Sequence, residues 1–526
     1  MPPQINPVLI LGAGINGAAL ARELLLNHIP VVLVDHADIA SGTTSWSTRL
    51  IHGGLRYLEH GETSLVYESL AERERFLRNS PEHVAPLELM IPVKSQFAGL
   101  VSSAAGFFNL PIFQSGNPSR GSWAIRSGLT MYDFLAGSQQ LGKHKRLSSQ
   151  RWKPIGFDPS FMDVFSYYDG QIEFPELYVS TLIRDAETIA QQNGVRFTLR
   201  TYRRPKLNGE HFEFENLLDF DSPTDPITPS ALVNASGPAG DETLEQLGIP
   251  SNRLFGGTRG SHLISHKPVL VEKLGRTGIY AEAFDGRPVF ILPWNSGALI
   301  GTTDLRHDGD PEVATATPEE IDYLLRCVNS VLPDVELKHE DITQHYSGVR
   351  PLPFVPEGST ASIPRGHWLH THEGTPWPCY TIVGGKLTTC RSLAEHSAET
   401  ILKQLGQKQV ANSQDRKTYE EGEKPKISPG GRARFVLQHL TGVAPEADTK
   451  TAAAASIEQL NAKTMADVIE RRLMLVFDPT LSVAHLEAVA DALIEAGKLS
   501  ADARQTTIDQ YIQRMDTRFG KQVLPA

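Results

Sequence analysis

The N-terminal part of the chain places two wholly apolar runs on either side of a helix pattern. Residues 8–11 and 31–34 contain no polar side chain, which is typical of short strands buried on both faces of a parallel sheet. Between them, a glycine-rich turn at residues 12–17 leads into a segment with the apolar spacing of an amphipathic helix. Asp35 follows the second run. The pattern predicts a βαβ unit that ends in an acidic residue.

Helical spacing recurs in the middle of the chain. A charged helix is predicted over residues 63–78, before Pro81. Residues 177–194 carry apolar side chains at helical intervals and end in glycine, and a strand pattern follows at residues 195–199. Residues 253–305 instead alternate short apolar runs with glycine and proline, as antiparallel strands do. The middle of the chain therefore combines helices with an antiparallel sheet.

The C-terminal part is predicted to be helical. A polar, charged linker at residues 406–431 precedes it. One helix is predicted to begin at Thr464, with Asp467 in its first turn, and another is capped by Ser500. The apolar stripes are those of a bundle core and indicate no chemistry. They comprise Leu486, Val489, Ala490 and Leu493, in a helix that Gly497 ends, and Ile508, Ile512, Met515 and Phe519.

Composition narrows the class of protein. A chain of 526 residues is too long for one compact core, so two or three domains are expected. No apolar run approaches the roughly 18 residues that span a bilayer, and the N-terminus lacks a signal pattern, so we expect a cytoplasmic protein. The three cysteines are widely spaced and predict buried thiols, with neither a disulfide framework nor a metal site. The net charge of −11 argues against a nucleic-acid partner and requires any anion site to be a local cluster of Arg and Lys.

The glycine-rich turn is the first segment of the chain that indicates a binding function. Gly12 suits the tight turn, Gly14 lets the backbone approach a pyrophosphate, and Gly17 lets the helix pack closely on the strand. Asp35 can accept hydrogen bonds from a ribose diol. The start of the helix presents N–H groups and a partial positive charge to phosphates. A purely structural turn is the alternative, but the flanking strands, helix and acid favour dinucleotide binding.

A hydroxyl-rich segment follows at residues 41–49 and runs into His-Gly-Gly-Leu-Arg-Tyr at residues 52–57. Hydroxyl and N–H groups suit a second line of contacts to a pyrophosphate or ribityl chain. The paired glycines suit a backbone that passes close to a flat ring. A polar surface loop is the alternative interpretation, but it does not account for the ending of the segment.

At these residues the chain resembles the FAD-dependent glycerol-3-phosphate dehydrogenases, which are amino-acid-oxidase-like flavoenzymes. Further blocks similar to that family lie at residues 232–238, 260–262, 300–304, 346–352, 384–389 and 428–431. The chain departs from the family pattern at Asp35, where Glu is more common, and at Ala239 and Cys390, where Trp and an aromatic residue are usual. Residues 99–116 look like additional material.

The resemblance implies an α/β (α+β) fold with three parts. A discontinuous Rossmann-like FAD-binding domain would comprise residues 1–94, 170–240 and 345–405. An antiparallel-sheet substrate domain would comprise residues 95–169 and 241–344. A C-terminal helical domain would follow the linker, at residues 432–526.

The resemblance also implies the cofactor and its contacts. FAD is expected to bind without a covalent bond, because no attachment motif is recognisable. Lys386 would add positive charge beside the flavin pyrimidine ring, where negative charge develops on reduction. The implied contacts are Gly12, Gly14, Ile15, Asn16, Gly17, Asp35, Thr43, Thr44, Ser47, Thr48, His52, Gly53, Gly54, Ala235, Gly237, Gly385, Lys386, Leu387 and Thr388.

The expected reaction needs a phosphate ligand and a base. The candidate phosphate ligands are Arg56, Arg350 and Arg365. The alternative interpretation for each arginine is that it forms a surface salt bridge. His52 is the candidate general base, with a structural histidine as the rival interpretation and Tyr57 as another base. Hydroxyls of Thr302 and Thr303 would contact substrate oxygens or cap local backbone.

The resemblance implies oxidation of sn-glycerol 3-phosphate to dihydroxyacetone phosphate, with hydride transfer to flavin N5 and electrons passed to a membrane quinone. An oxidase that uses O2, an amine or amino-acid oxidase, and a flavin-binding regulator without turnover are the alternatives. A homodimer is possible. We also expect peripheral contact with the cytoplasmic face of the inner membrane through apolar residues 99–113, flanked by Lys94, Arg120, Trp123 and Arg126, with packing in the core as the rival interpretation.

Overall fold

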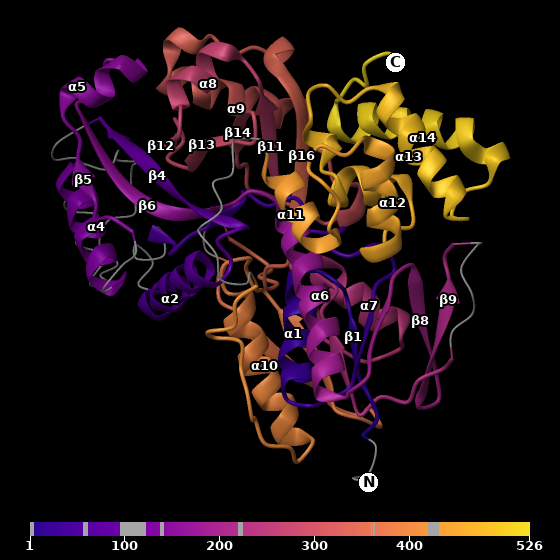
Figure 1. The fold of residues 1–526 in the computed structure, drawn as a ribbon. Coiled ribbons are helices and arrows are strands. Elements are labelled where there is room, and N and C mark those ends of the chain that lie inside the picture. The colour runs from indigo at the N-terminus through magenta and orange to yellow at the C-terminus, as the bar shows by residue number, and fades with distance from the viewer. Residues whose placement is uncertain are drawn as a thin grey trace.

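The computed structural model describes residues 5–55, 62–94, 122–136, 141–218, 225–358, 360, 363–418 and 431–526, without the side chains of residues 123 and 124 (Figure 1). The predicted residues Arg56 and Tyr57 and the apolar segment 99–113, with Arg120 and the Trp123 side chain, lie outside this description. None of the described helices combines the length and apolar character needed to cross a membrane.

The smaller sheet confirms the βαβ prediction. Within the described residues it has six strands in the order β17-β18-β10-β1-β2-β7, parallel except for β17. The strands β1, β2 and β10 are wholly buried, because helices cover one face of them and the β8–β9 hairpin (residues 203–216), α7 (Gly240–Gln246) and nearby loops cover the other. The strands are β1 (Val8–Leu11), β2 (Val31–Val34), β7 (Phe197–Arg200), β10 (Ala231–Asn234), β17 (Trp368–His372) and β18 (Cys379–Val383).

Three helices pack beside this sheet, and α1 contacts both of the others (Figure 1). They are α1 (Ile15–Leu26), α6 (Pro175–Asn193) and α10 (Cys390–Gln404). The helix predicted at residues 177–194 is thereby confirmed, and Gly194 ends it in the left-handed conformation with φ of 62°. A separate hairpin, β8 (Arg203–Asn208) and β9 (His211–Asn216), follows β7.

The larger sheet is mainly antiparallel and runs in the order β15-β11-β14-β13-β12-β4-β6-β3, with β16 added beside β11 and β5 beside β6. The antiparallel strands predicted in residues 253–305 are confirmed, with one helix, α8 (Pro268–Leu274), between them. The strands are β3 (Leu50–Ile51), β4 (Val84–Val93), β5 (Lys145–Arg146), β6 (Asp163–Ile172), β11 (Thr258–Ser265), β12 (Thr277–Glu282), β13 (Pro288–Trp294), β14 (Gly297–Gly301), β15 (Leu305–Arg306) and β16 (Ile342–Arg350).

Other helices border the two sheets. The helix predicted at residues 63–78 is α2, and α8 and α9 share a hydrophobic core with the larger sheet. These helices are α2 (Thr63–Asn79), α4 (Ser122–Ala136), α5 (Ser149–Trp152), α7 (Gly240–Gln246) and α9 (Pro318–Val331).

Strand pairing shows which sheet two strands of the predicted FAD-binding segments enter. In residues 1–94, β4 pairs along its whole length with β6, and β16, which overlaps residues 345–405, pairs with β11, so both strands lie in the larger sheet. The apolar sequence of a buried strand does not specify its partner. The domain limits stay a prediction.

The C-terminal part is helical, as predicted. Thr464 and Asp467 form the expected start, because the Thr464 hydroxyl accepts from the Asp467 N–H while the Asp467 carboxylate accepts from the Thr464 N–H. Ser500 precedes a short 3-10 turn rather than capping α14 directly. The elements are α11 (Arg432–Thr441), α12 (Thr449–Gln459), the π-helical segment η8 (Asp467–Arg472), α13 (Val483–Glu495) and α14 (Arg504–Phe519).

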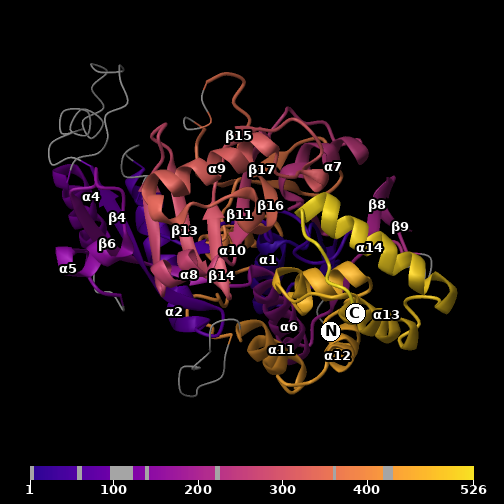
Figure 2. The ribbon, with the colours of Figure 1, turned by 90° about the horizontal axis from the view of Figure 1, so that it is seen from above.

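These helices are docked on the rest of the molecule (Figure 2). Asp38, in the loop after β2, is wholly buried and receives ion pairs from Arg471 at 2.7 Å and Arg472 at 2.8 Å. The described part of the predicted linker is attached as well, because Arg416 pairs with Asp185 of α6 at 2.6 Å. The C-terminal domain is thus anchored beside the turn that carries the dinucleotide motif.

Candidate active site

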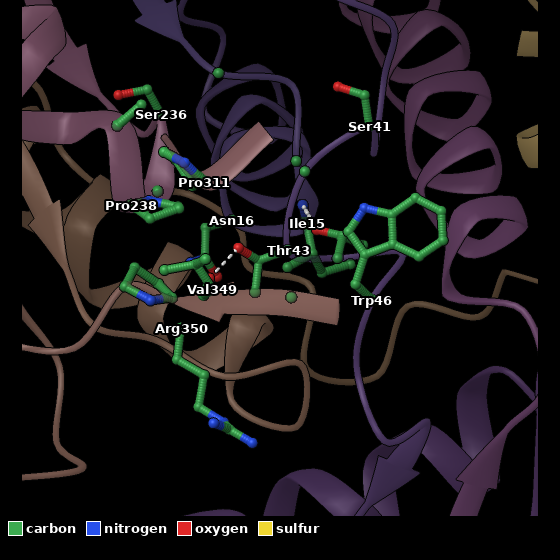
Figure 3. Close-up of a pocket in the computed structure, with 18 of the residues that line it drawn as sticks. Ile15, Asn16, Ser41, Thr43, Trp46, Ser236, Pro238, Pro311, Val349 and Arg350 are labelled. Atoms are coloured by element: carbon green, nitrogen blue, oxygen red, sulfur yellow. Dashed lines mark hydrogen bonds between the residues drawn. The ribbon is translucent and has the colours of Figure 1, made fainter. Parts of the chain in front are cut away.

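A cavity of about 830 Å³ lies where the two sheets and the C-terminal helices meet. Its size is that of a site for a large organic ligand, for which roughly 300–1,000 Å³ is usual. It is lined by the β1–α1 turn, the hydroxyl-rich loop and the end of β16 (Figure 3). The turn before α10 also lines it. Most of the residues predicted from the sequence converge on its wall.

The β1–α1 turn can exist only with glycine at its key positions. Gly12 has φ of +109°, and a Cβ there would lie 2.4 Å from the carbonyl oxygen of Ala235. A Cβ on Gly17 would lie 1.9 Å from the Gly12 carbonyl oxygen, so this residue permits the close helix–strand contact. Gly14 precedes α1 without a side-chain cap. The helix N-terminus and its partial positive charge therefore face the cavity.

Asp35 stands at the end of β2 and lines the same cavity. Its carboxylate accepts from the Ala13 N–H at 2.7 Å and from the Ala37 N–H at 2.9 Å, which fixes its orientation. Burial raises the pKa of Asp35, and His36 and the two N–H groups oppose that shift. A fixed acid beyond a glycine turn is the arrangement that recognises a ribose diol.

The hydroxyls of the loop at residues 41–49 mainly hold the loop in place. The Thr43 hydroxyl donates to the Val349 carbonyl at 2.6 Å (Figure 3). The Thr44 hydroxyl accepts from the Ile15 N–H at 3.1 Å, and the Ser47 hydroxyl accepts from the Arg49 N–H at 3.3 Å. Thr43, Thr44, Ser47 and Thr48 all line the cavity. The loop therefore ties the dinucleotide turn to β16 while keeping its atoms at the cavity wall.

Residues from two later sequence blocks, 232–238 and 384–389, also line the cavity. Ala235, Gly237, Gly385, Leu387 and Thr388 line the cavity with Ile15 and Asn16. A Cβ on Gly385 would lie 2.6 Å from the Asn16 amide nitrogen, so the two segments touch only because this residue is glycine. In the part of the chain that the structure describes, the buried Asn16 Oδ1 has no hydrogen-bond partner. It is an acceptor that a bound ligand can satisfy.

Lys386 lines the cavity beside these glycines. Burial lowers the pKa of Lys386 to about 7, although Glu62 opposes the shift. Its charge is therefore adjustable near neutral pH, and an anionic group in the cavity would favour the charged form.

Among the predicted residues that the structure describes, Gly17, Gly53, Gly54, Thr302 and Thr303 do not line the cavity. Gly17 packs against the turn, as described above. Gly53 donates its N–H to the Tyr132 hydroxyl at 3.0 Å, and a Cβ there would lie 2.4 Å from Leu70, while Gly54 has φ of 73°. The Thr302 hydroxyl accepts a hydrogen bond from Arg350 at 3.1 Å and so orients a side chain that does line the cavity.

Arg350 and Arg365 both line the cavity and share one carboxylate. Asp304 receives Arg350 at 3.1 Å on one oxygen and Arg365 at 3.3 Å on the other. Burial would raise the pKa of Asp304, but the two guanidinium groups outweigh it and lower that pKa. Thr303, in contrast, donates to Glu320 at 2.6 Å within a buried network, so its hydroxyl serves the fold. The role of Asp304 was not predicted. The sequence does not show that this carboxylate pairs with both Arg350 and Arg365, which lie far from it along the chain.

His52 lines the cavity near Lys386. Burial lowers the pKa of His52, Lys386 and Arg73 add to the shift, and Asp169 opposes it. The imidazole is therefore neutral near pH 7 and able to accept a proton. Asp169 belongs to a buried network in which it accepts from Tyr132 at 2.6 Å and from Arg73 at 2.9 Å. No motif marked this network in the sequence.

Sequence reasoning also missed other cavity residues. His262 is wholly buried, lies 2.9 Å from the Thr48 hydroxyl and stacks on Tyr346 with ring centroids 4.8 Å apart. Its place in the Gly-Ser-His block was the available signal. We expected no chemistry from the C-terminal helices, yet their residues Arg471, Arg514 and Arg518 line the cavity. Arg514 and Arg518 follow a helical pattern in which charged residues are usual, and Arg471 is buried by contacts that the sequence does not show.

The residues at the cavity wall fit FAD. The glycine turn at residues 12–17, the Asp35 carboxylate and the unpaired Asn16 oxygen would hold the cofactor, which would extend from Asp35 towards Lys386. FAD would supply an acceptor for a hydride. The rest of the cavity retains Arg350, Arg365 and His52 for a substrate.

Comparisons with known proteins agree with this geometry. Residues 7–391 match the protein family described as FAD dependent oxidoreductase. The chain is 34% identical over 416 residues to a glycerol-3-phosphate dehydrogenase of Synechocystis, covering 76% of this chain and 70% of that protein. It is 30% identical over 415 residues to the D-erythritol 1-phosphate dehydrogenase of Brucella abortus, covering 77% and 76%.

A solved structure shares the fold. The glycerol-3-phosphate dehydrogenase from Bacillus halodurans, complexed with FAD, superposes with a TM-score of 0.69 and 19% identity over 98% of this chain and 96% of that one. The family match over residues 7–391 and the identity to curated relatives show that the chain belongs to the FAD-dependent glycerol-3-phosphate dehydrogenase family, with FAD as its cofactor.

Proposed function

We propose that the protein oxidises sn-glycerol 3-phosphate at C2 to dihydroxyacetone phosphate, with hydride transfer to the flavin N5. The observation that carries the proposal is the pair Arg350 and Arg365, held by Asp304 in the cavity that also contains the dinucleotide cradle. Two guanidinium groups with one shared carboxylate leave net positive charge, which suits a phosphate. Arg56 is the further phosphate ligand implied by the family resemblance.

The substrate phosphate is the part that these arginines would recognise. A rigidly paired guanidinium presents several donors in fixed directions and so fixes the position of C2 relative to the flavin. An amine has no anionic group and an amino acid has one carboxylate, so neither substrate requires two arginines as a phosphate dianion does. The arginine pair therefore favours a phosphorylated alcohol over the amino-acid oxidase alternative.

His52 would take the proton from the C2 hydroxyl at a ring nitrogen while the C2 hydrogen leaves as hydride. Its neutral imidazole and its place on the cavity wall support this role. The buried Asp169, Tyr132 and Arg73 network would hold the adjoining Gly53 backbone still. Lys386 would supply positive charge near the reduced cofactor.

For the electron acceptor we propose a membrane quinone, reached by peripheral contact with the cytoplasmic face of the inner membrane. The family resemblance and the apolar composition of residues 99–113 support this proposal. Replacing Phe107, Phe108 and Phe113 with Ser should move the protein from sedimenting liposomes to the supernatant while activity with a soluble dye persists. Loss of flavin in that variant would instead place the segment in the core.

A longer phosphorylated polyol is the second candidate substrate. The specific observation is that identity to the D-erythritol 1-phosphate dehydrogenase, 30%, is close to the 34% found for a glycerol-3-phosphate dehydrogenase. Both substrates carry a phosphate for the same arginines, so chain length would be read elsewhere in the cavity.

Anaerobic reduction of the bound flavin tests both candidates. Glycerol 3-phosphate, D-erythritol 1-phosphate and glycerol are mixed separately with the yellow protein, and the visible flavin absorbance is followed. Bleaching by glycerol 3-phosphate at the lowest concentration supports the proposal, and bleaching by the tetritol phosphate alone would replace it. Bleaching by glycerol at equal concentration would remove phosphate recognition. Re-admitting oxygen, or a soluble quinone, then separates an oxidase from a dehydrogenase.

A further inference from the structure

A second group of potential ligands lies behind the cavity wall. Glu68 of α2, His367 just before β17 and His396 of α10 each offer one ligand atom, and all three atoms lie within 4.8 Å of one another. The His367 Nε2 and the Glu68 Oε1 are 3.7 Å apart. The three residues come from elements that are far apart in the sequence, so their convergence is a property of the fold.

The state of these side chains suits a metal ion. The His367 side chain is only 10% exposed, and its Nε2, at 3.7 Å from the Glu68 Oε1, is too far away for a direct hydrogen bond to that carboxylate. Ser392 donates to Glu68 and so orients the carboxylate, as second partners of metal ligands commonly do. His396 is exposed, which leaves the point accessible from solvent. Lys386 is a positively charged group near these ligands, and the negative charges of Glu62 and Glu68 oppose its effect.

We propose that Glu68, His367 and His396 form a binding site for Zn²⁺, with water as the fourth ligand. Two imidazoles and one carboxylate are ligands that Zn²⁺ accepts, whereas Mg²⁺ and Ca²⁺ prefer oxygen alone. Tetrahedral Zn²⁺ with bonds of about 2.0–2.2 Å places its ligand atoms roughly 3.4 Å apart. Binding of the ion would have to draw the three ligand atoms, now within 4.8 Å of one another, to that separation.

The site adjoins the active cavity without lining it. His367 follows Arg365 and Gly366, which do line it. A Cβ on Gly384 would lie 2.5 Å from the Gly366 carbonyl and 3.4 Å from the His367 Cα, so this segment packs on the turn that carries Lys386. An ion bound to His367 would therefore restrain two segments of the cavity wall, residues 365–366 and the turn that carries Lys386. The metal would influence the active site without entering the cavity.

Equilibrium zinc titration of the full-length, FAD-loaded protein tests the proposal. The protein is freed of any histidine tag, treated with chelator and titrated in competition with a chromophoric zinc indicator. The expected result is one Zn²⁺ per chain, with no competition from Mg²⁺ or Ca²⁺. His396→Gln and Glu68→Gln should each weaken binding by at least about tenfold, the scale seen when the surroundings of a metal ligand are altered.

A matched control is His339→Gln. His339 is also exposed and also pairs with a carboxylate, Asp322, at 2.7 Å, but it lacks a second imidazole. Its substitution should leave the affinity unchanged, and all three variants should keep the flavin content and circular dichroism of the parent. Absence of stoichiometric zinc binding in the parent would overturn the proposal. Equal affinity in the parent, His396→Gln and Glu68→Gln would do so as well, because the bound ion would then lie elsewhere.

Discussion

At the scale of single residues, the cavity brings together charges whose partners decide what each can do. Arg350 is the clearest case, because Asp304 and the Thr302 hydroxyl already direct its guanidinium. Arg350→Ala should lower kcat/KM for glycerol 3-phosphate by about two to four decades, since each charge-assisted hydrogen bond contributes roughly 1.5–3 kcal/mol. Flavin content should not change.

Steady-state kinetics with glycerol 3-phosphate and with glycerol checks this expectation. Arg306→Ala is the matched control, because Arg306 bonds only to the carbonyls of Val355 and Gly358 in the described structure. An equal loss with both substrates would show that Arg350 does not bind the phosphate.

His52→Asn should slow flavin reduction far more than it weakens substrate binding, because a base acts in the transition state. Typical losses on removing a general base are about 10²–10⁴-fold. Rapid mixing with substrate deuterated at C2 measures the step directly. An unchanged reduction rate in the variant would assign the proton transfer to another residue.

Lys386 should make flavin reduction depend on pH. Its pKa of about 7 means that the charged form predominates below neutrality and disappears as the pH rises. The reduction rate is therefore expected to decline above pH 7 as this charge is lost, on top of any effect of His52. In Lys386→Met the rate should be lower and this decline absent. A variant that retains the full pH profile would exclude Lys386 as its cause.

At the scale of elements, a contact between distant loops closes one end of the cavity. His36, next to Asp35, pairs with Glu312, and Pro311 and Glu312 line the cavity with it (Figure 3). The Glu312 hydrogen bond raises the pKa of His36 from 6.5 to about 9. A raised pKa in the folded state means that this contact is fully stabilising below pH 6.5 and is lost as the pH rises through about 9.

We therefore expect FAD release to accelerate between pH 6.5 and 9, because the loop at Glu312 then loses its hold beside the ribose position. Flavin fluorescence, which increases on release, follows the rate. His36→Gln should remove most of this pH dependence while leaving the rate at high pH near that of the parent. A pH dependence that persists in the variant would locate the titrating group elsewhere.

Sequence patterns predicted elements better than they predicted partnerships. The runs at β1 and β2, the helices α2 and α6, and the Thr464 helix start could be read from local spacing, because burial and capping leave a local signature. The pairing of β4 with β6 and of β16 with β11 could not, because a buried strand carries no label for its neighbour. The same holds for the site. Glycines and Asp35 have a fixed spacing, whereas Asp304, Asp169 and Arg518 reach the cavity region only through the tertiary fold.

At the scale of the whole molecule, the C-terminal domain is held by a buried charge cluster. Asp38 accepts from both Arg471 and Arg472, and all three are buried. Asp38→Ala removes the only carboxylate that pairs with Arg472 among the described residues and one of three that pair with Arg471, and it should cost about 3–5 kcal/mol of unfolding free energy. Denaturant unfolding monitored by circular dichroism checks this.

Lys450→Ala provides the comparison from the same domain. Its ion pair with Glu495 is on the surface, and such pairs contribute about 0–1 kcal/mol. If Asp38→Ala proved no more destabilising than this surface variant, the cluster would not be what anchors the domain.

The order of strands in the smaller sheet has a consequence for biosynthesis. The Gly12 turn needs Ala235 of the chain after β10, and the wall opposite Asn16 needs Gly385, which follows β18. A ribosome therefore releases the dinucleotide turn long before the strands that complete its sheet have been translated. An N-terminal fragment that ends before Gly385 lacks part of the cavity wall, so we expect FAD to bind late in synthesis. Until β10 and β7 have been translated, β1 and β2 can pair only with each other, and their outer edges are open to aggregation.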